Sequence, residues 1–129
     1  MKRDATEEVP ATAPPDVVLE VEYEAGALFL VLRNIGAGPA HAVRCAFDRP
    51  VKGAHPERPV NELRLFRHLE FLAPGREIRT LLDSAEAFLA REPDPRFRVR
   101  VRFDDDAGER WTRTIRHDLS IYRDLVVRL

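Results

Sequence analysis

The stretch that decides the fold is Arg96-Phe97-Arg98-Val99-Arg100-Val101-Arg102-Phe103. Arginine and apolar side chains alternate along it, and successive side chains of an extended chain point to opposite faces. The four apolar residues therefore share one face and the four arginines share the other. This pattern predicts an antiparallel strand that covers a hydrophobic core on one side and meets water or a partner on the other.

The same alternation recurs along the chain and predicts more strands of this kind. Residues 17–24 alternate apolar side chains with glutamates, and residues 41–48 place Val43, Cys45 and Phe47 on the inner face. Strands are predicted at residues 17–24, 41–48, 76–82, 96–103 and 110–117. Residues 27–32 are apolar without alternation, which is typical of a central strand covered on both faces or of a strand at an interface.

Glycine, proline and aspartate mark the connections between these segments. In the loop after Arg33, two glycines and Pro39 are expected to supply the positive and fixed φ angles of a tight turn. Asp104 to Glu109 predicts a hairpin connection with its glycine late in the loop. Residues 60–72 fit either a helical face or two short strands, and residues 118–129 carry apolar side chains at helical spacing.

One short helix is predicted near residues 84–91. Asp83-Ser84-Ala85-Glu86 has the spacing of a capping box, with Asp83 as the N-cap and Glu86 reaching back to it. Prolines 93 and 95 end the helix. Seven or so short strands with turn signals between them then indicate an all-β sandwich.

Length and composition fit one domain of this kind. The chain has 129 residues, with 21 Lys and Arg against 22 Asp and Glu, so its net charge favours no particular partner. We expect a flexible acidic and Pro-rich leader at 1–16, the sandwich at 17–122 and an apolar tail at 123–129. A single cysteine, no membrane-spanning apolar run and no apolar signal core at the start predict a cytoplasmic protein.

Four segments carry a resemblance to a known family. They are Leu32-Arg33-Asn34-Ile35-Gly36, Pro39-Ala40-His41-Ala42-Val43, Leu72-Ala73-Pro74-Gly75, and Phe103-Asp104-Asp105 leading to Gly108. Over residues 17–122 the chain resembles bacterial immunoglobulin-like domains, and is similar to cell-adhesion-related bacterial modules and their relatives fused to membrane helices. The resemblance implies an all-β, immunoglobulin-like Greek-key sandwich of about seven strands in two packed sheets, used for binding or spacing.

The sequence offers little for catalysis. His41 and Cys45 lie about 13 Å apart along one predicted strand, and Cys45 is expected in the core. His117 and Asp118 are adjacent on a strand and therefore point to opposite faces. We predict no enzyme activity, no catalytic residues, no cofactor and no small-molecule substrate. A calcium site at the acidic residues 104–106 and Glu109 is the alternative to a solvated hairpin tip, but their spacing does not match a calcium loop.

The arginine face is the main candidate for function. Arg98, Arg100 and Arg102 share this face, and either Arg113 or Arg116 of the partner strand joins them, depending on a register that the sequence leaves open. Guanidinium groups in a row suit acidic side chains or phosphates. The alternative is that this face is solvated and balanced by glutamates of neighbouring strands. The acidic strand at 17–24 is expected in the other sheet, so the two outer faces differ in charge.

The C-terminal stretch is a second candidate surface, with Tyr122, Leu125, Val126 and Leu129 as its binding residues. It either packs back on the sandwich or docks into another chain. The sequence therefore favours a non-enzymatic protein-interaction or structural module, acting through a protein partner, a larger assembly or self-association. The alternative is a binder of an anionic polymer such as nucleic acid through its arginines, and no membrane partner is expected.

Overall fold

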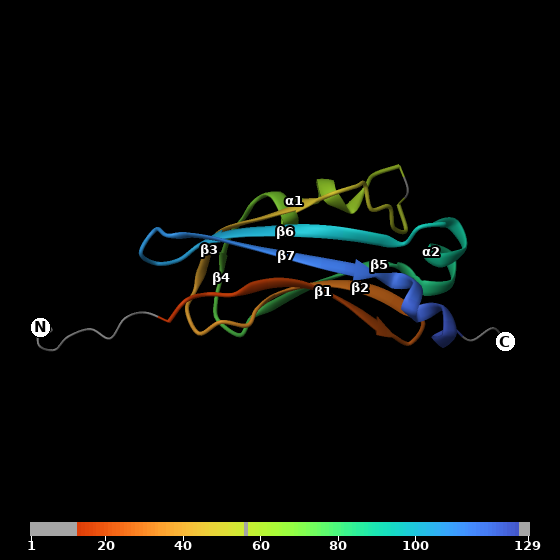
Figure 1. Cartoon of the computed structure of the whole chain (residues 1–129), viewed down its shortest axis with the longest axis horizontal. Helices are drawn as coiled ribbons and strands as arrows, with labels where there is room; N and C mark the ends of the chain where they lie inside the picture. The colour runs from red at the N-terminus through yellow and green to blue at the C-terminus, as the bar shows by residue number, and fades with distance from the viewer. Residues whose placement is uncertain (1–12, 56, 127–129) are drawn as a thin grey trace, which may run out of the picture.

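The protein is an all-β sandwich. A computed structural model describes residues 13–55 and 57–126, and its strands form two antiparallel sheets that pack face to face (Figure 1). The smaller sheet has the order β1-β2-β5, from Val17–Glu24, Ala27–Asn34 and Glu77–Ser84. The larger sheet has the order β4-β3-β6-β7, from Leu69–Leu72, Ala40–Phe47, Arg96–Asp104 and Arg110–Asp118.

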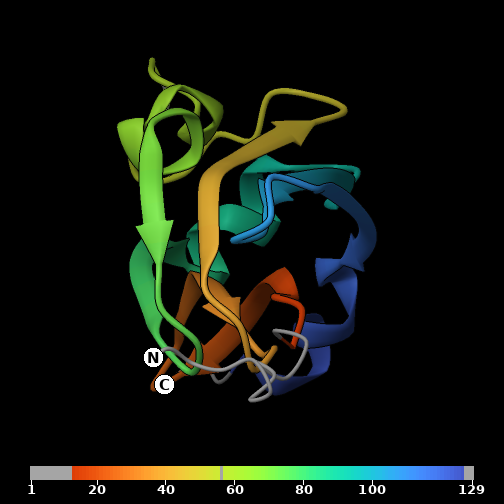
Figure 2. The same cartoon turned by 90° about the vertical axis from the view of Figure 1, so that its left-hand side faces the viewer.

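This strand order confirms the predicted immunoglobulin-like Greek-key sandwich. The chain crosses between the sheets after β2, after β4 and after β5. β4 and β7 are the two edge strands of the larger sheet and lie on opposite sides of the molecule (Figure 2). β1 and β6 belong to different sheets, as predicted, so the glutamates of β1 and the arginines of β6 face away from each other.

The core lies between the sheets and follows the alternation of the strands. Along β6 the residues are alternately exposed and buried, and Phe97, Val99, Val101 and Phe103 all point inward. β2 is the central strand of its sheet, and even Val31, on its outer side, is fully buried. The first of the two alternatives for residues 27–32 therefore holds.

The stretch at 60–72 combines both of the structures that the sequence left open. It begins with a 3-10 helix, η1 (Val60–Glu62), continues with α1 (Arg64–Arg67) and ends in the strand β4. Phe66 of α1 is buried, and its ring packs edge-on against the ring of Phe47 with centroids 5.4 Å apart. No helix among the described residues is long and apolar enough to cross a membrane.

The predicted short helix is present as α2 (Ala85–Arg91), but its predicted cap is wrong by one residue. Ser84 is the N-cap, and its hydroxyl accepts a hydrogen bond from the Ala87 N–H at 3.1 Å. Asp83 stays in β5 and is buried, and its Oδ2 pairs with Arg91 at 2.9 Å. The carboxylate therefore ties the end of the helix to the sheet instead of capping its start.

The loop after β2 is built around a buried side chain. Asn34 is fully buried, its Oδ1 accepts from the N–H groups of Asp16 and Gly36, and its Nδ2 donates to the carbonyls of Gly38 and Leu72. Gly36 and Gly38 are not at positive φ, contrary to expectation. They are required for close approach, since a Cβ at Gly36 would lie 2.5 Å from the backbone nitrogen of Asp16.

That loop also holds the end of the predicted leader. The Gly38 N–H donates to the Pro14 carbonyl at 3.2 Å, and Pro15 is buried. Residues 13–16 are thus part of the packed domain, while the predicted leader's residues 1–12 lie outside the described residues.

Candidate interaction surfaces

The outer side of the larger sheet carries a row of arginines. Antiparallel pairing places Arg116 of β7 directly opposite Arg98 of β6, and Arg44 of β3 directly opposite Arg102. Arg100 lies between Ala46 and Thr114. Residues directly opposite each other in a sheet point to the same side. We call this set the basic face: Arg44, Arg98, Arg100, Arg102 and Arg116.

The register decides which arginine of β7 belongs to this face. Arg113 is paired with Val101, which points into the core, so Arg113 leaves the candidate row and Arg116 stays in it. Arg113 instead reaches β1's side of the sandwich, where its Nε and Nη2 lie 2.7 and 2.5 Å from the Asp16 carboxylate. Arg44 was missed by the sequence analysis, although its place between inward Val43 and Cys45 already indicates an outward side chain.

Most of the basic face lacks neutralising partners. Arg44 pairs with Glu70 at 3.0 Å, and Arg98 lies 3.5 Å from Asp48. Within the described residues, no carboxylate lies within ion-pair distance of the other three guanidiniums, those of Arg100, Arg102 and Arg116. Like charges placed directly opposite each other destabilise a sheet. In each opposed pair one arginine has a carboxylate partner and the other, Arg102 or Arg116, has none among the described residues, so each pair keeps one guanidinium that an anion could bind.

Two open hollows lie along this face. One, of about 310 Å³, is lined by Phe47, Asp48, Arg98, Arg100 and Thr114, among others. The other, of about 490 Å³, has Arg98 and Arg116 in its lining, together with Arg49 and Arg96. Asp94 pairs with both Arg49 and Arg96, at 3.3 and 2.7 Å, and Asp48 and Asp118 also line this hollow. Among the described residues, Arg116 is therefore the one guanidinium lining the second hollow that has no carboxylate within ion-pair distance, since Arg98 lies beside Asp48.

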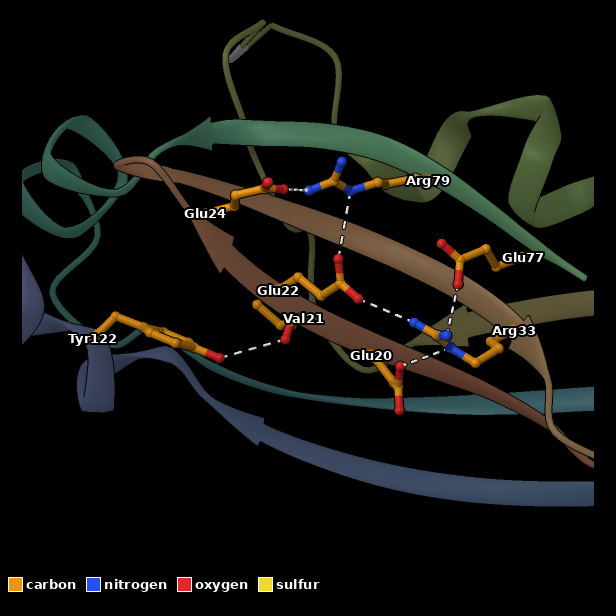
Figure 3. Close-up of polar contacts among 8 residues, drawn as sticks. All are labelled: Glu20, Val21, Glu22, Glu24, Arg33, Glu77, Arg79 and Tyr122. Carbon is orange, nitrogen blue, oxygen red and sulfur yellow. Dashed lines mark hydrogen bonds and ion pairs between the residues drawn. The ribbon is translucent and has the colours of Figure 1, made fainter.

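The outer side of the smaller sheet has the opposite character. Arg33 of β2 bonds to Glu20 and Glu22 of β1 at 3.0 Å each and to Glu77 of β5 at 2.6 Å (Figure 3). Arg79 continues the chain of contacts to Glu22, at 3.4 Å, and to Glu24. We call these six residues the acidic face. It has two more carboxylates than guanidiniums, and each of its arginines is fully engaged.

The C-terminal segment packs back on the sandwich. It forms the 3-10 helix η2 (Leu119–Leu125), in which Leu119 is buried. The Tyr122 ring stacks on Tyr23 of β1 with centroids 5.5 Å apart, and its hydroxyl donates to the Val21 carbonyl at 3.4 Å. Val126 is partly buried against the core, Leu125 is 52% exposed, and Leu129 lies outside the described residues. Of the two predicted arrangements, the packed one is seen.

The groups considered for catalysis are separated. Cys45 points into the core, and burial raises the pKa of its thiol to about 12. His41 points outward and bonds to Asp106 at 2.7 Å. His117 contacts the Leu19 carbonyl at 2.7 Å, whereas Asp118 caps η2 through Ser120. These side chains do not converge on a common point.

Two carboxylates of the acidic hairpin tip, residues 104–109, form hydrogen bonds and an ion pair within the same hairpin. Asp105 accepts hydrogen bonds from the N–H groups of Ala107 and Glu109 and from the Trp111 indole. These bonds, the indole's above all, lower the pKa of Asp105. Asp104 pairs with Arg110 at 3.0 Å. Among the described residues, no three His, Cys, Asp or Glu side chains are grouped so as to hold a metal ion.

Fold and surfaces together define a two-sheet β-sandwich with one basic and one acidic outer face. The chain belongs to the family described as a domain of unknown function, DUF8453, whose model matches residues 1–123. No curated protein and no solved structure matches the chain.

Proposed function

We propose that this chain is a non-enzymatic protein-interaction module whose basic face binds an acidic surface of a partner protein. The observation that carries the proposal is the pair of direct arginine oppositions, Arg44 to Arg102 and Arg98 to Arg116. Local rules of sheet stability are broken at functional sites more often than elsewhere. A carboxylate placed between two opposed guanidiniums would convert a repulsive pair into two charge-assisted contacts.

The geometry favours an acidic polypeptide over nucleic acid. Binding of single strands combines a basic groove with aromatic side chains on which bases stack. Trp111, the natural stacking group on β7, is paired with Phe103 on the inward side of the sheet, and its indole N–H is bonded to Asp105. A flat row of guanidiniums without this ring suits carboxylates on an extended or folded partner.

The test is a binding titration of polyglutamate with the wild-type chain and two charge-reversal variants. Arg100→Glu with Arg102→Glu reverses two charges on the basic face. Arg58→Glu with Arg76→Glu reverses the same number at exposed positions outside the larger sheet. We expect the first variant to lose at least about tenfold in affinity and the second to stay within about threefold of wild type.

Two outcomes would contradict the proposal. One is equal loss of affinity in both variants, which would reduce the effect to net charge. The other is preference for an oligothymidylate over polyglutamate at the same salt concentration, with affinity falling steeply as salt rises. That result would assign the basic face to nucleic acid through release of counterions.

A further inference from the structure

The sheet edges of this sandwich differ in how well they are covered. On β1, two edge carbonyls are occupied: His117 of β7 contacts the Leu19 oxygen and Tyr122 of η2 contacts the Val21 oxygen. On β5, the Leu82 carbonyl accepts the Ala54 N–H at 2.8 Å. β4 is only four residues long, which itself protects an edge. β1 is thus covered at two carbonyls and β5 at one, and β4 is short.

β7 is different because it is a long edge strand with an open side. It has nine residues, pairs only with β6, and its residues 110–114 are all exposed. Within the described residues, no hydrogen bond joins its backbone to any group outside β6 and the adjoining turns. An unpaired row of N–H and C=O groups of this length is a template for another strand.

We infer that β7 pairs with β7 of a second copy of this chain, antiparallel and centred on Thr114. A twofold axis through Thr114 places Arg110 of each copy opposite Asp118 of the other. It also places Trp111 opposite His117, Thr112 opposite Arg116, and Arg113 opposite Ile115. All nine residues then have a partner, and the two ends of the interface each gain an Arg–Asp pair.

The neighbouring registers are worse for identifiable reasons. If the twofold axis passed through Arg113 instead of Thr114, Arg113 would lie opposite its own copy and Arg110 opposite Arg116. If the axis passed through Ile115, Arg110 and Trp111 would lie beyond the end of the partner strand. The charges of β7 are therefore self-complementary in the register centred on Thr114 and repulsive or incomplete in the other two.

Pairing in this register would join the larger sheets of two copies into one sheet of eight strands. The axis is perpendicular to the sheet, so the two basic faces would lie on the same side and form one continuous surface. The inference does not rest on the proposed function, because Arg100 and Arg102 lie on β6, one strand away from the new edge. Their charge reversal leaves the pairing of β7 intact.

Two measurements test the inference. The first is sedimentation equilibrium of the wild-type chain, which is expected to show a concentration-dependent dimer. The second is oxidative cross-linking of two single-cysteine variants, Thr114→Cys and Thr112→Cys, each combined with Cys45→Ala. Opposed residues in an antiparallel pair have Cα atoms about 4.5–5.5 Å apart, within the range for a disulfide. Thr112 would be roughly 14 Å from its own copy, four residues out of register.

We expect Thr114→Cys to form a disulfide-linked dimer and Thr112→Cys to form at least about tenfold less under the same conditions. Both positions are exposed threonines on the same side of β7, so they form a matched pair. A wild-type chain that stays monomeric from micromolar to near-millimolar concentration would overturn the inference. So would a dimer in which the two cysteine variants cross-link equally, because the register would then be wrong.

Discussion

Arg98 on β6 lies directly opposite Arg116 on β7, and both point to the outer side of the larger sheet. Arg44 and Arg102 repeat the arrangement one strand away. Like charges directly opposite each other on neighbouring strands lower the stability of a sheet by up to about 1 kcal/mol for each pair. The strands nevertheless pair, because the inward residues of β6 are buried. The sheet is thus stabilised by its inner face and weakened by its outer one.

The first prediction concerns that weakness. Arg116→Glu replaces a repulsive cross-strand pair by an attractive one, so we expect the free energy of unfolding to rise by roughly 0.5–1 kcal/mol. Binding of polyglutamate should fall at the same time. Urea denaturation at low salt measures the first effect, and the gain should shrink in high salt because these side chains are exposed. A loss of stability in Arg116→Glu would show that the opposed arginines do not repel.

The second prediction concerns the acidic face. Arg33→Met keeps most of the apolar stem but leaves Glu20, Glu22 and Glu77 without their shared guanidinium. We expect a loss of about 1–2 kcal/mol, since a network is worth more than an isolated surface pair. The matched control is Arg100→Met, which removes an arginine that has no carboxylate within ion-pair distance in the described part of the chain and should leave stability unchanged or slightly higher. Equal losses in the two variants would refute the distinction between the faces.

The third prediction concerns acid stability. The Arg113 guanidinium, chiefly through its hydrogen bonds, lowers the pKa of Asp16 below its usual 3.8 in the folded chain. A folded-state pKa below the unfolded one means that the ion pair contributes stability above about pH 4 and that this contribution is lost as the pH falls further. Thermal unfolding of wild type should therefore weaken more steeply below about pH 4 than that of Asp16→Asn. Parallel pH profiles would contradict the assignment.

The fourth prediction concerns the C-terminal segment. Tyr122→Ala removes the ring stacked on Tyr23 and should cost about 1–3 kcal/mol of unfolding free energy. Tyr122→Phe keeps the stack and loses one long hydrogen bond, so its cost should stay below about 1 kcal/mol. Leu125→Ala, at a half-exposed position, should change stability by no more than about 0.5 kcal/mol. The ranking is checked by denaturant midpoints, and a neutral Tyr122→Ala would mean that the segment is not packed in solution.

The sequence predicted the sandwich because period-two alternation specifies both the strand and its buried side. It could not choose between Arg113 and Arg116, since shifting the register of β6 and β7 by one residue exchanges their faces. The hairpin that follows Asp104 sets this register, because it pairs Asp104 with Arg110 and thereby places Arg116 on the outer face. The existence of the basic face was therefore predictable from the sequence, whereas the full set of arginines in it was not.

The role of Asn34 was not predictable either. Its four hydrogen bonds reach partners as distant in sequence as Asp16 and Leu72, and no local pattern announces such contacts. The glycines beside it were assigned to turn geometry, while the structure uses them for the close approach of residues 13–16. Local signals predict backbone conformation, but close approach depends on which segments the fold brings together.

The most direct test of the basic face is an NMR titration of the ¹⁵N-labelled chain with polyglutamate. We expect the largest amide shifts on β3, β6 and β7, at and beside Arg44, Arg100, Arg102 and Arg116, and none of similar size on β1, β2 or β5. Shifts centred on the smaller sheet, or no saturable shifts at all at low salt, would contradict the claim that this face binds an acidic partner.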